Sequence, residues 1–153
     1  MNFSNPFALS MSLFACGAWL ALAYPSDGVA VRFEVRLAES KPTPGLTEAT
    51  VEGSKTKVYL HDTAELTGSD VADARAVERD RKAAIEIVFT ESARKKLASL
   101  TEKHVGKPLA LLVDGKVAFA PILRAQIADG KALITGNFTL EEAQRLAKGI
   151  RTR

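Results

Sequence analysis

Residue types that support catalysis or metal binding are few and widely spaced in this sequence. His61 and His104 are the only histidines, and neither lies in an H-x-x-x-H or H-x-x-E-H zinc motif. Asp62 follows His61, but neighbouring residues on a strand point to opposite faces, so we expect no acid–base pair there. No serine lies in a G-x-S-x-G segment. The sequence therefore predicts no catalytic residue, metal site or cofactor, and we expect a protein that is not an enzyme.

Two Gly-Lys segments superficially resemble phosphate-binding loops. The segment Gly53–Lys57 (GSKTK) lacks the second glycine and the following helix of such a loop, so it is interpreted as a hairpin tip. Gly106 and Lys107 end a helix instead of starting one, with Gly106 in the C-cap position. Neither segment predicts a nucleotide site.

The single cysteine, Cys16, lies in an N-terminal segment of unusual composition. No charged side chain precedes Asp27, and Leu9–Ala23 is apolar or small throughout, as is typical of an export signal. Three interpretations of residues 1–23 stay open: a signal peptide cleaved after Ala23, lipidation at Cys16, or a retained membrane anchor. We expect an exported protein of the periplasm or cell envelope, which associates with the membrane only through this segment if it is kept. Cleavage after Ala23 would leave no cysteine for disulfides or zinc.

Charged residues are numerous but evenly mixed. The chain has 21 basic and 18 acidic residues, with a net charge of +3. A nucleic-acid site requires clustered positive charge, so we expect no nucleic-acid partner. With 46% hydrophobic and 25% charged residues, the 153-residue chain has the composition of one globular domain. We divide it into residues 24–56, an N-terminal strand and linker region of the same sheet, and residues 57–153, the main domain.

The positioning elements are mainly strands. From Val29 to Leu37 apolar and polar residues alternate, which predicts a strand with one buried face and a solvated face that carries Glu34. Ser69 is a candidate N-cap for one helical turn. The other predicted elements are a loop over Lys41–Gly45, strands Ala49–Glu52, Lys57–His61 and Ile85–Thr90, and a helix Glu91–His104 capped by Thr90.

The best-defined unit is a hairpin. Leu109–Val113 is a short apolar run followed by Asp114-Gly115, a pair suited to a type I′ turn, and Lys116–Ala120 returns until Pro121 stops the strand. Ala132–Thr135 is a third short strand between turn signals. Phe119 and Phe138 flank the hairpin and are either core residues or part of an apolar surface that contacts a partner.

The last helix begins with a capping box. Thr139 and Glu142 have the T-x-x-E spacing, and the apolar face of the helix consists of Leu140, Ala143, Leu146, Ala147 and Ile150. Together the elements predict an α+β fold, with two helices packed on one face of a mainly antiparallel sheet.

Several motifs in a fixed order resemble one family. They are T-x-x-x-x-G-K (Thr101–Lys107, with Gly106), D-G-K-V (Asp114–Val117, with Gly115), Ala120-Pro121, and I-T-G-x-F-T-x-E-E-A (Ile134–Ala143, with Thr135, Gly136, Thr139 and Glu142). This series resembles the head subdomain of the first extracytoplasmic (P1) domain of the protein-export subunit SecD, over roughly Val58 to Ile150.

The resemblance implies a function in protein export. In that family the head is carried on a proton-driven membrane protein and holds or pulls the emerging polypeptide outside the membrane. We expect a stand-alone copy without the membrane part not to act as a motor. We expect a non-catalytic exported module that binds polypeptide or an envelope protein, with the export machinery as a candidate partner, by adding a strand at a sheet edge. The alternative is a structural or sensory accessory domain with no export role.

Overall fold

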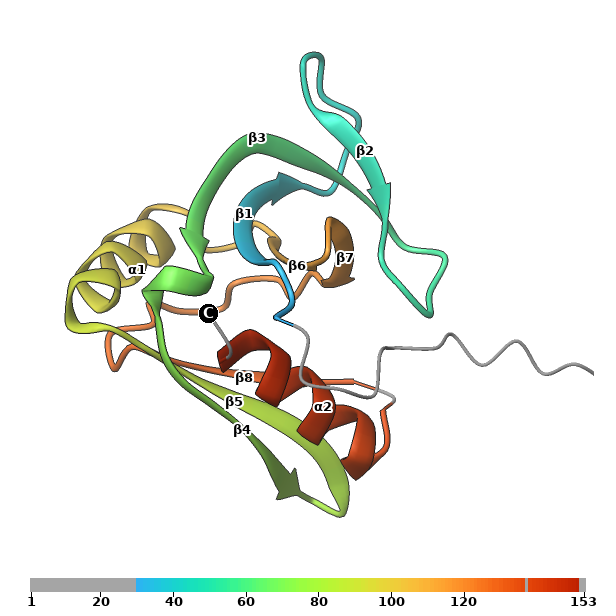
Figure 1. Cartoon of the computed structure of the whole chain (residues 1–153). Helices are drawn as coiled ribbons and strands as arrows, with labels where there is room; N and C mark the ends of the chain where they lie inside the picture. Colours follow the sequence, from blue (N-terminus) through green and yellow to red (C-terminus); the bar gives the residue numbers. More distant parts are fainter. Residues whose placement is uncertain (1–29, 137, 152–153) are drawn as a thin grey trace, which may run out of the picture.

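The computed structural model of the chain describes residues 30–136 and 138–151. Within them, eight strands and two α-helices form two antiparallel sheets (Figure 1). The α+β class expected from the sequence is confirmed, although the strands divide between two sheets where one was expected. The elements are β1 Phe33–Glu39, β2 Thr47–Thr50, β3 Lys57–Thr67, a 3₁₀ turn Gly68–Asp70, β4 Val71–Arg79, β5 Lys82–Phe89, α1 Glu91–Lys103, β6 Leu109–Val113, β7 Lys116–Phe119, β8 Lys131–Thr135 and α2 Leu140–Arg151.

The larger sheet has the strand order β2-β3-β1-β6-β7 and curls strongly (Figure 1). The curl brings the segment after β2 to the far edge, where the Glu52 backbone N–H donates to the Val117 carbonyl at 2.9 Å. Small residues such as Ala38 and Ala110 line the inside of the curve, since a tight curve leaves little room for side chains. This inner cluster consists of Ala38, Val58, Leu60, Ala110, Leu112 and Val117.

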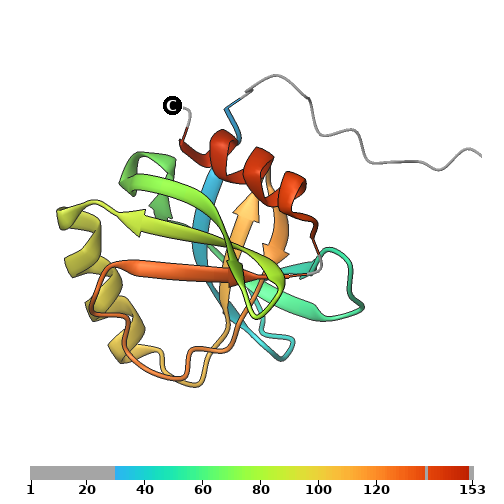
Figure 2. The ribbon, with the colours of Figure 1, turned by 90° about the horizontal axis from the view of Figure 1, so that it is seen from below.

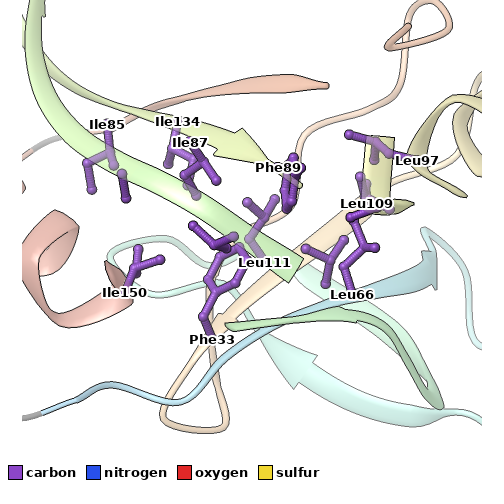
Figure 3. Close-up of a cluster of buried hydrophobic side chains, with 14 of the residues drawn as sticks. Phe33, Leu66, Ile85, Ile87, Phe89, Leu97, Leu109, Leu111, Ile134 and Ile150 are labelled. Carbon is purple, nitrogen blue, oxygen red and sulfur yellow. The ribbon is translucent and has the colours of Figure 1, made fainter. Parts of the chain in front are cut away.

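The smaller sheet has the order β4-β5-β8, and α2 lies along it (Figure 2). The main hydrophobic core fills the space between the two sheets and the two helices. Figure 3 shows ten of its labelled side chains: Phe33, Leu66, Ile85, Ile87, Phe89, Leu97, Leu109, Leu111, Ile134 and Ile150.

Strand β6 explains why the Leu109–Val113 run is apolar throughout. Leu109 and Leu111 face the main core, whereas Ala110 and Leu112 face the inner cluster. A strand buried on both faces cannot alternate apolar and polar residues. The predicted hairpin is confirmed, with Asp114 at φ +51° and Gly115 at φ +80°, as a type I′ turn requires.

The prediction for β1 was partly wrong. Glu34, expected on a solvated face, is only 7% exposed, and Ala38 is fully buried whereas Leu37 is half-buried. The pairing of β1 with β3 shifts register between Val35 and Ala38, and such bulges change which side chains face inward. Both faces of β1 are covered in this fold, so neither face is solvated along its whole length.

Three local predictions also need correction. Ser69 does not cap a helical turn; Thr67 occupies the N-cap position of the 3₁₀ turn, and its N–H donates to Asp70 Oδ2 at 2.9 Å. The next residues, predicted as helical, begin the strand β4 at Val71 because they pair with β5. Leu140, assigned to the apolar face of α2, is 45% exposed since it lies at the first residue of the helix.

The N-terminal predictions lie outside the described residues. They are the signal peptide or anchor over residues 1–23, cleavage after Ala23 and lipidation at Cys16. Within residues 30–136 and 138–151, neither helix is long and apolar enough to cross a membrane.

Candidate functional site

An apolar cavity of about 380 Å³ opens between the two sheets. Its floor is core, with Val35, Leu97, Leu109 and Leu111 each no more than 5% exposed. Its walls are the end of β7 with the following loop on one side and β8 on the other. Lys131 is the one charged residue among those that line it. The cavity therefore suits apolar groups.

The wall formed by β8 is a strand edge. All five residues from Lys131 to Thr135 line the cavity. Successive side chains of a strand point to opposite faces, so side chains on one face alone would give every second residue. The continuous lining indicates that the backbone edge of β8 borders the cavity. Residues 119–121 line the opposite wall in the same continuous way.

That edge of β8 carries hydrogen-bonding groups without a strand partner. The Phe89 N–H donates to the Gly130 carbonyl at 2.9 Å, which places Gly130 and then Ala132 and Ile134 in the pairs bonded to β5. The N–H and C=O of Leu133 and Thr135 therefore point away from β5. In the described part of the chain no strand follows β8 in its sheet. Thus the cavity borders an open sheet edge.

One group on this edge is already occupied. The Lys131 N–H donates to Asp129 Oδ1 at 3.1 Å. This bond closes the start of the edge, because the N–H is no longer available to an incoming chain. Pairing along β8 is therefore limited to the Lys131 carbonyl and the groups of Leu133 and Thr135.

The loop wall is fixed to α1 through a buried hydroxyl. Thr101 is fully buried, its Oγ1 donates to the Leu97 carbonyl at 2.7 Å, and it accepts the Ile127 N–H at 2.9 Å. Gln126 Nε2 also donates to the Ala98 carbonyl at 3.3 Å. Leu97 and Ile127 both line the cavity, so this network holds its shape.

Two aromatic rings meet at the Thr135 end of the cavity. Phe119 and Phe138 pack edge to face, with ring centroids 5.7 Å apart and planes at 86°. Gly136 lies against both rings, because an added Cβ would be 2.6 Å from Cε1 of Phe119 and of Phe138. Both rings are half-buried and pack against the main core, and Phe119 also lines the cavity. A larger residue at position 136 would therefore displace one of the two rings, which explains the glycine in the T-G-x-F segment.

The other motif residues hold turns and helix ends. The C-cap of α1 is His104 and not Gly106 as predicted; Gly106 lies two residues further on, with φ +89°. Its N–H donates to the Leu123 carbonyl at 2.8 Å. Lys107 Nζ donates to Glu39 Oε1 at 2.6 Å. Asp114 Oδ1 accepts the Arg32 N–H at 2.9 Å. The last two contacts tie Lys107 to β1 and the hairpin turn to the residue before β1.

Three more motif residues lie beside the cavity or at the start of α2. The Pro121 carbonyl accepts the Leu109 N–H at 2.9 Å, so the chain stays paired to β6 just past β7. Thr139 and Glu142 form the capping box, with the Thr139 N–H donating to Glu142 Oε2 at 2.8 Å and the Glu142 N–H donating to Thr139 Oγ1 at 3.2 Å.

Titratable groups do not converge on the cavity. His61 Nε2 lies 3.9 Å from Glu39 Oε1 on the surface, and His104 Nδ1 lies 2.7 Å from the Leu100 carbonyl at the end of α1. Among the described residues, no three His, Cys, Asp or Glu side chains gather as a metal site. The hydrogen bond from Lys107 and its charge lower the pKa of Glu39 below its ordinary value.

The sequence patterns predicted no functional role for Leu133 or Lys131, the two residues that most distinguish this site. Leu133 is 42% exposed on an open strand edge, and Lys131 stands at the start of that edge. A signal was present: the short strand between Asp129-Gly130 and Gly136 contains an apolar residue at each of its three central positions. The fold puts two of them inward and leaves Leu133 outside.

One protein family matches this chain. A family model described as "SecDF, P1 head subdomain" matches residues 45–152. The protein translocase subunit SecDF of Thermus thermophilus is 40% identical over 88 residues, which are 57% of this chain and 12% of that protein. The subunit SecD of Rhodobacter capsulatus is 40% identical over 93 residues, 60% of this chain and 17% of that protein. The chain thus spans less than a fifth of the length of either relative.

Solved structures of SecDF have the same fold as this chain. A crystal structure of SecDF in a "super-membrane-facing form" superposes with a TM-score of 0.69 at 29% identity, over 82% of this chain and 19% of that one. A second structure, titled "Structure and function of a membrane component SecDF that enhances protein export", gives a TM-score of 0.66 at 28% identity, over 82% of this chain and 64% of that one.

Proposed function

Because the chain belongs to the SecDF P1 head family, we propose that it is a non-catalytic, exported module that binds polypeptide in protein export. The bound segment is extended and adds as a strand to the open edge of β8. Its apolar side chains enter the cavity between the sheets. Its partner is the Sec export machinery. The module receives the segment from this machinery or delivers it there.

The observation that carries the proposal is the junction of an open edge with an apolar cavity. Leu133 and Thr135 present two N–H and two C=O groups toward a space lined by core residues. Strand addition uses such groups for affinity and uses pockets for alternate side chains. Backbone groups are common to every polypeptide, so this mode suits a module that handles many sequences.

The relatives support a role in export and not a catalytic one. One is described as a membrane component that enhances protein export, and the others as translocase subunits. The chain matches a small share of their length, so the proposal concerns only the holding of polypeptide by this domain. Export of the module to the cell envelope depends on residues 1–23.

A proline at residue 133 tests the proposal. Leu133→Pro removes the N–H that faces the open edge but no bond to β5, because the Leu133 groups point away from that strand. We expect the variant to keep its far-UV circular dichroism spectrum and to bind fluorescent apolar peptides about ten-fold more weakly in a polarisation assay, as for loss of a central hydrogen bond.

The matched variants separate backbone from side chain. Leu133→Ala keeps the edge N–H and is expected to lose less affinity than Leu133→Pro. Ala132→Pro removes an N–H that bonds to β5, so it is expected to unfold the small sheet. Equal peptide affinity of the wild type and a folded Leu133→Pro variant would exclude strand addition at β8. Capture of one folded envelope protein with no peptide binding would favour the accessory-domain alternative.

A further inference from the structure

The side chains of β8 also determine which polypeptide segments bind best at its open edge. This inference depends on the proposed function. In an added strand, each residue sits directly opposite one residue of β8, with its side chain on the same face. The β8 side chains therefore specify the partner residue by residue.

The inward positions select apolar residues. Ala132 and Ile134 pack against the main core, on the side of the sheet that borders the cavity. Partner residues opposite them would enter the cavity, where a polar group would lose its hydration without a replacement. Aliphatic side chains are thus preferred at these two positions.

The outward positions differ from one another. Lys131, Leu133 and Thr135 point to the other face, since they alternate with Ala132 and Ile134. Leu133 is 42% exposed, so an apolar residue opposite it would bury its side chain and strengthen binding. Thr135 tolerates a β-branched residue such as threonine or valine. Lys131 is a cation at the end of the row.

The Lys131 ammonium group is available for a partner. No ion pair joins it to any other residue that the structure describes. Glu86, which pairs with Leu133, lies diagonally across β5 and is bound to Arg75 at 2.5 Å. The Asp129 carboxylate accepts the backbone N–H of Lys131 and makes no ion pair with its ammonium group. The charge at this position of the outer face is therefore positive, and a carboxylate opposite Lys131 on an added strand is the complementary group.

We propose that the edge of β8 selects an extended segment in which a run of three apolar residues is followed by an aspartate or glutamate, bound antiparallel to β8 with the acid opposite Lys131. The direction follows from the pairing: every strand pair in the described residues is antiparallel. In that direction the acid is C-terminal to the apolar run. The Asp129 bond to the Lys131 N–H ends the pairing there.

Three labelled peptides test this selection on the full chain: TVLVD, TVLVN and TVLVK, each with blocked ends. An opposite-charge pair across two strands contributes up to about 1 kcal/mol, or about five-fold in affinity. We therefore expect TVLVD to bind about two- to five-fold more tightly than TVLVN, and TVLVK to bind most weakly. The order should be reversed by Lys131→Glu. Lys82→Glu, the same charge change at the other end of β5, should leave it unchanged.

The outcomes are distinguishable. If none of the peptides binds, the proposed function itself fails. If all three bind with equal affinity, the function stands and the selection by Lys131 is refuted. The comparison of peptides on the wild-type protein does not depend on the folding of a variant. Tighter binding of the reversed peptide DVLVT than of TVLVD would refute the antiparallel direction.

Discussion

Glu34 should be the most important charged residue for stability in this fold. Its side chain is 10% exposed and lies between Arg36 of the same strand and Arg32, which precedes the strand. Arg32 Nε donates to Oε1 at 2.7 Å, and Arg36 donates to Oε2 from Nε at 3.0 Å and from Nη2 at 2.8 Å. Glu34→Gln keeps the shape of the side chain and removes its charge.

The two arginines should contribute unequally. The Arg32 side chain is 67% exposed, so water screens its ion pair, and Arg32→Ala should change stability little. The Arg36 side chain is 21% exposed and makes two of the three bonds. Hydrogen bonds to a charged group in such a setting contribute about 1.5–3 kcal/mol. We expect Glu34→Gln to lower the free energy of unfolding by about 2 kcal/mol at neutral pH.

The effect should depend on pH. Burial by itself would raise the pKa of Glu34, but the hydrogen bonds and charges of Arg32 and Arg36 outweigh it and lower the pKa below its ordinary value of 4.5. A carboxylate with a lowered pKa stabilises the folded state above its unfolded pKa. That stability is lost as the pH falls through the folded pKa. The difference between wild type and Glu34→Gln should therefore be full at pH 7 and shrink below about pH 4.5.

Urea unfolding followed by far-UV circular dichroism measures this difference at pH 7 and at pH 3.5. The only tryptophan, Trp19, precedes the described residues, so its fluorescence is not a suitable probe. Glu48→Gln is the matched control, because Glu48 also pairs with a cation on the same sheet but is 50% exposed. If Glu34→Gln unfolds at the same urea concentration as the wild type at pH 7, the arginine clamp does not stabilise the fold.

Three further substitutions test the packing around the cavity and one strained turn. Gly136→Ala should cost about 1–3 kcal/mol, because its methyl group would overlap the ring of Phe119, and thermal unfolding measures this loss. Arg81→Gly should stabilise by about 0.5 kcal/mol in urea unfolding, since Arg81 has φ +62° in the β4–β5 turn and glycine adopts that conformation freely; an unchanged midpoint would show that the turn is not strained. Thr101→Val should cost about 1–3 kcal/mol and speed amide exchange at Ile127, whereas Thr101→Ser should keep that amide protected.

The sequence by itself determined the local structure where the signal is chemical. Asp114-Gly115 predicts a type I′ turn because few other pairs adopt two positive φ angles, and the turn is present. The T-x-x-E spacing of Thr139 and Glu142 predicts a capping box, and both of its hydrogen bonds are present. The ordered motifs also pointed to the family that the comparisons then showed.

Only the tertiary structure decided which faces are buried and which edge stays open. Glu34 was predicted to face solvent because it alternates with apolar neighbours. Instead, a bulge in β1 and the covering of both faces of this strand bury it between two arginines. The exposure of Leu133 depends on β8 being last in its sheet, and strand order is set by contacts between residues far apart in the chain. Periodicity reports whether a residue has an apolar neighbour two positions away. It carries no information about which strand, if any, lies alongside.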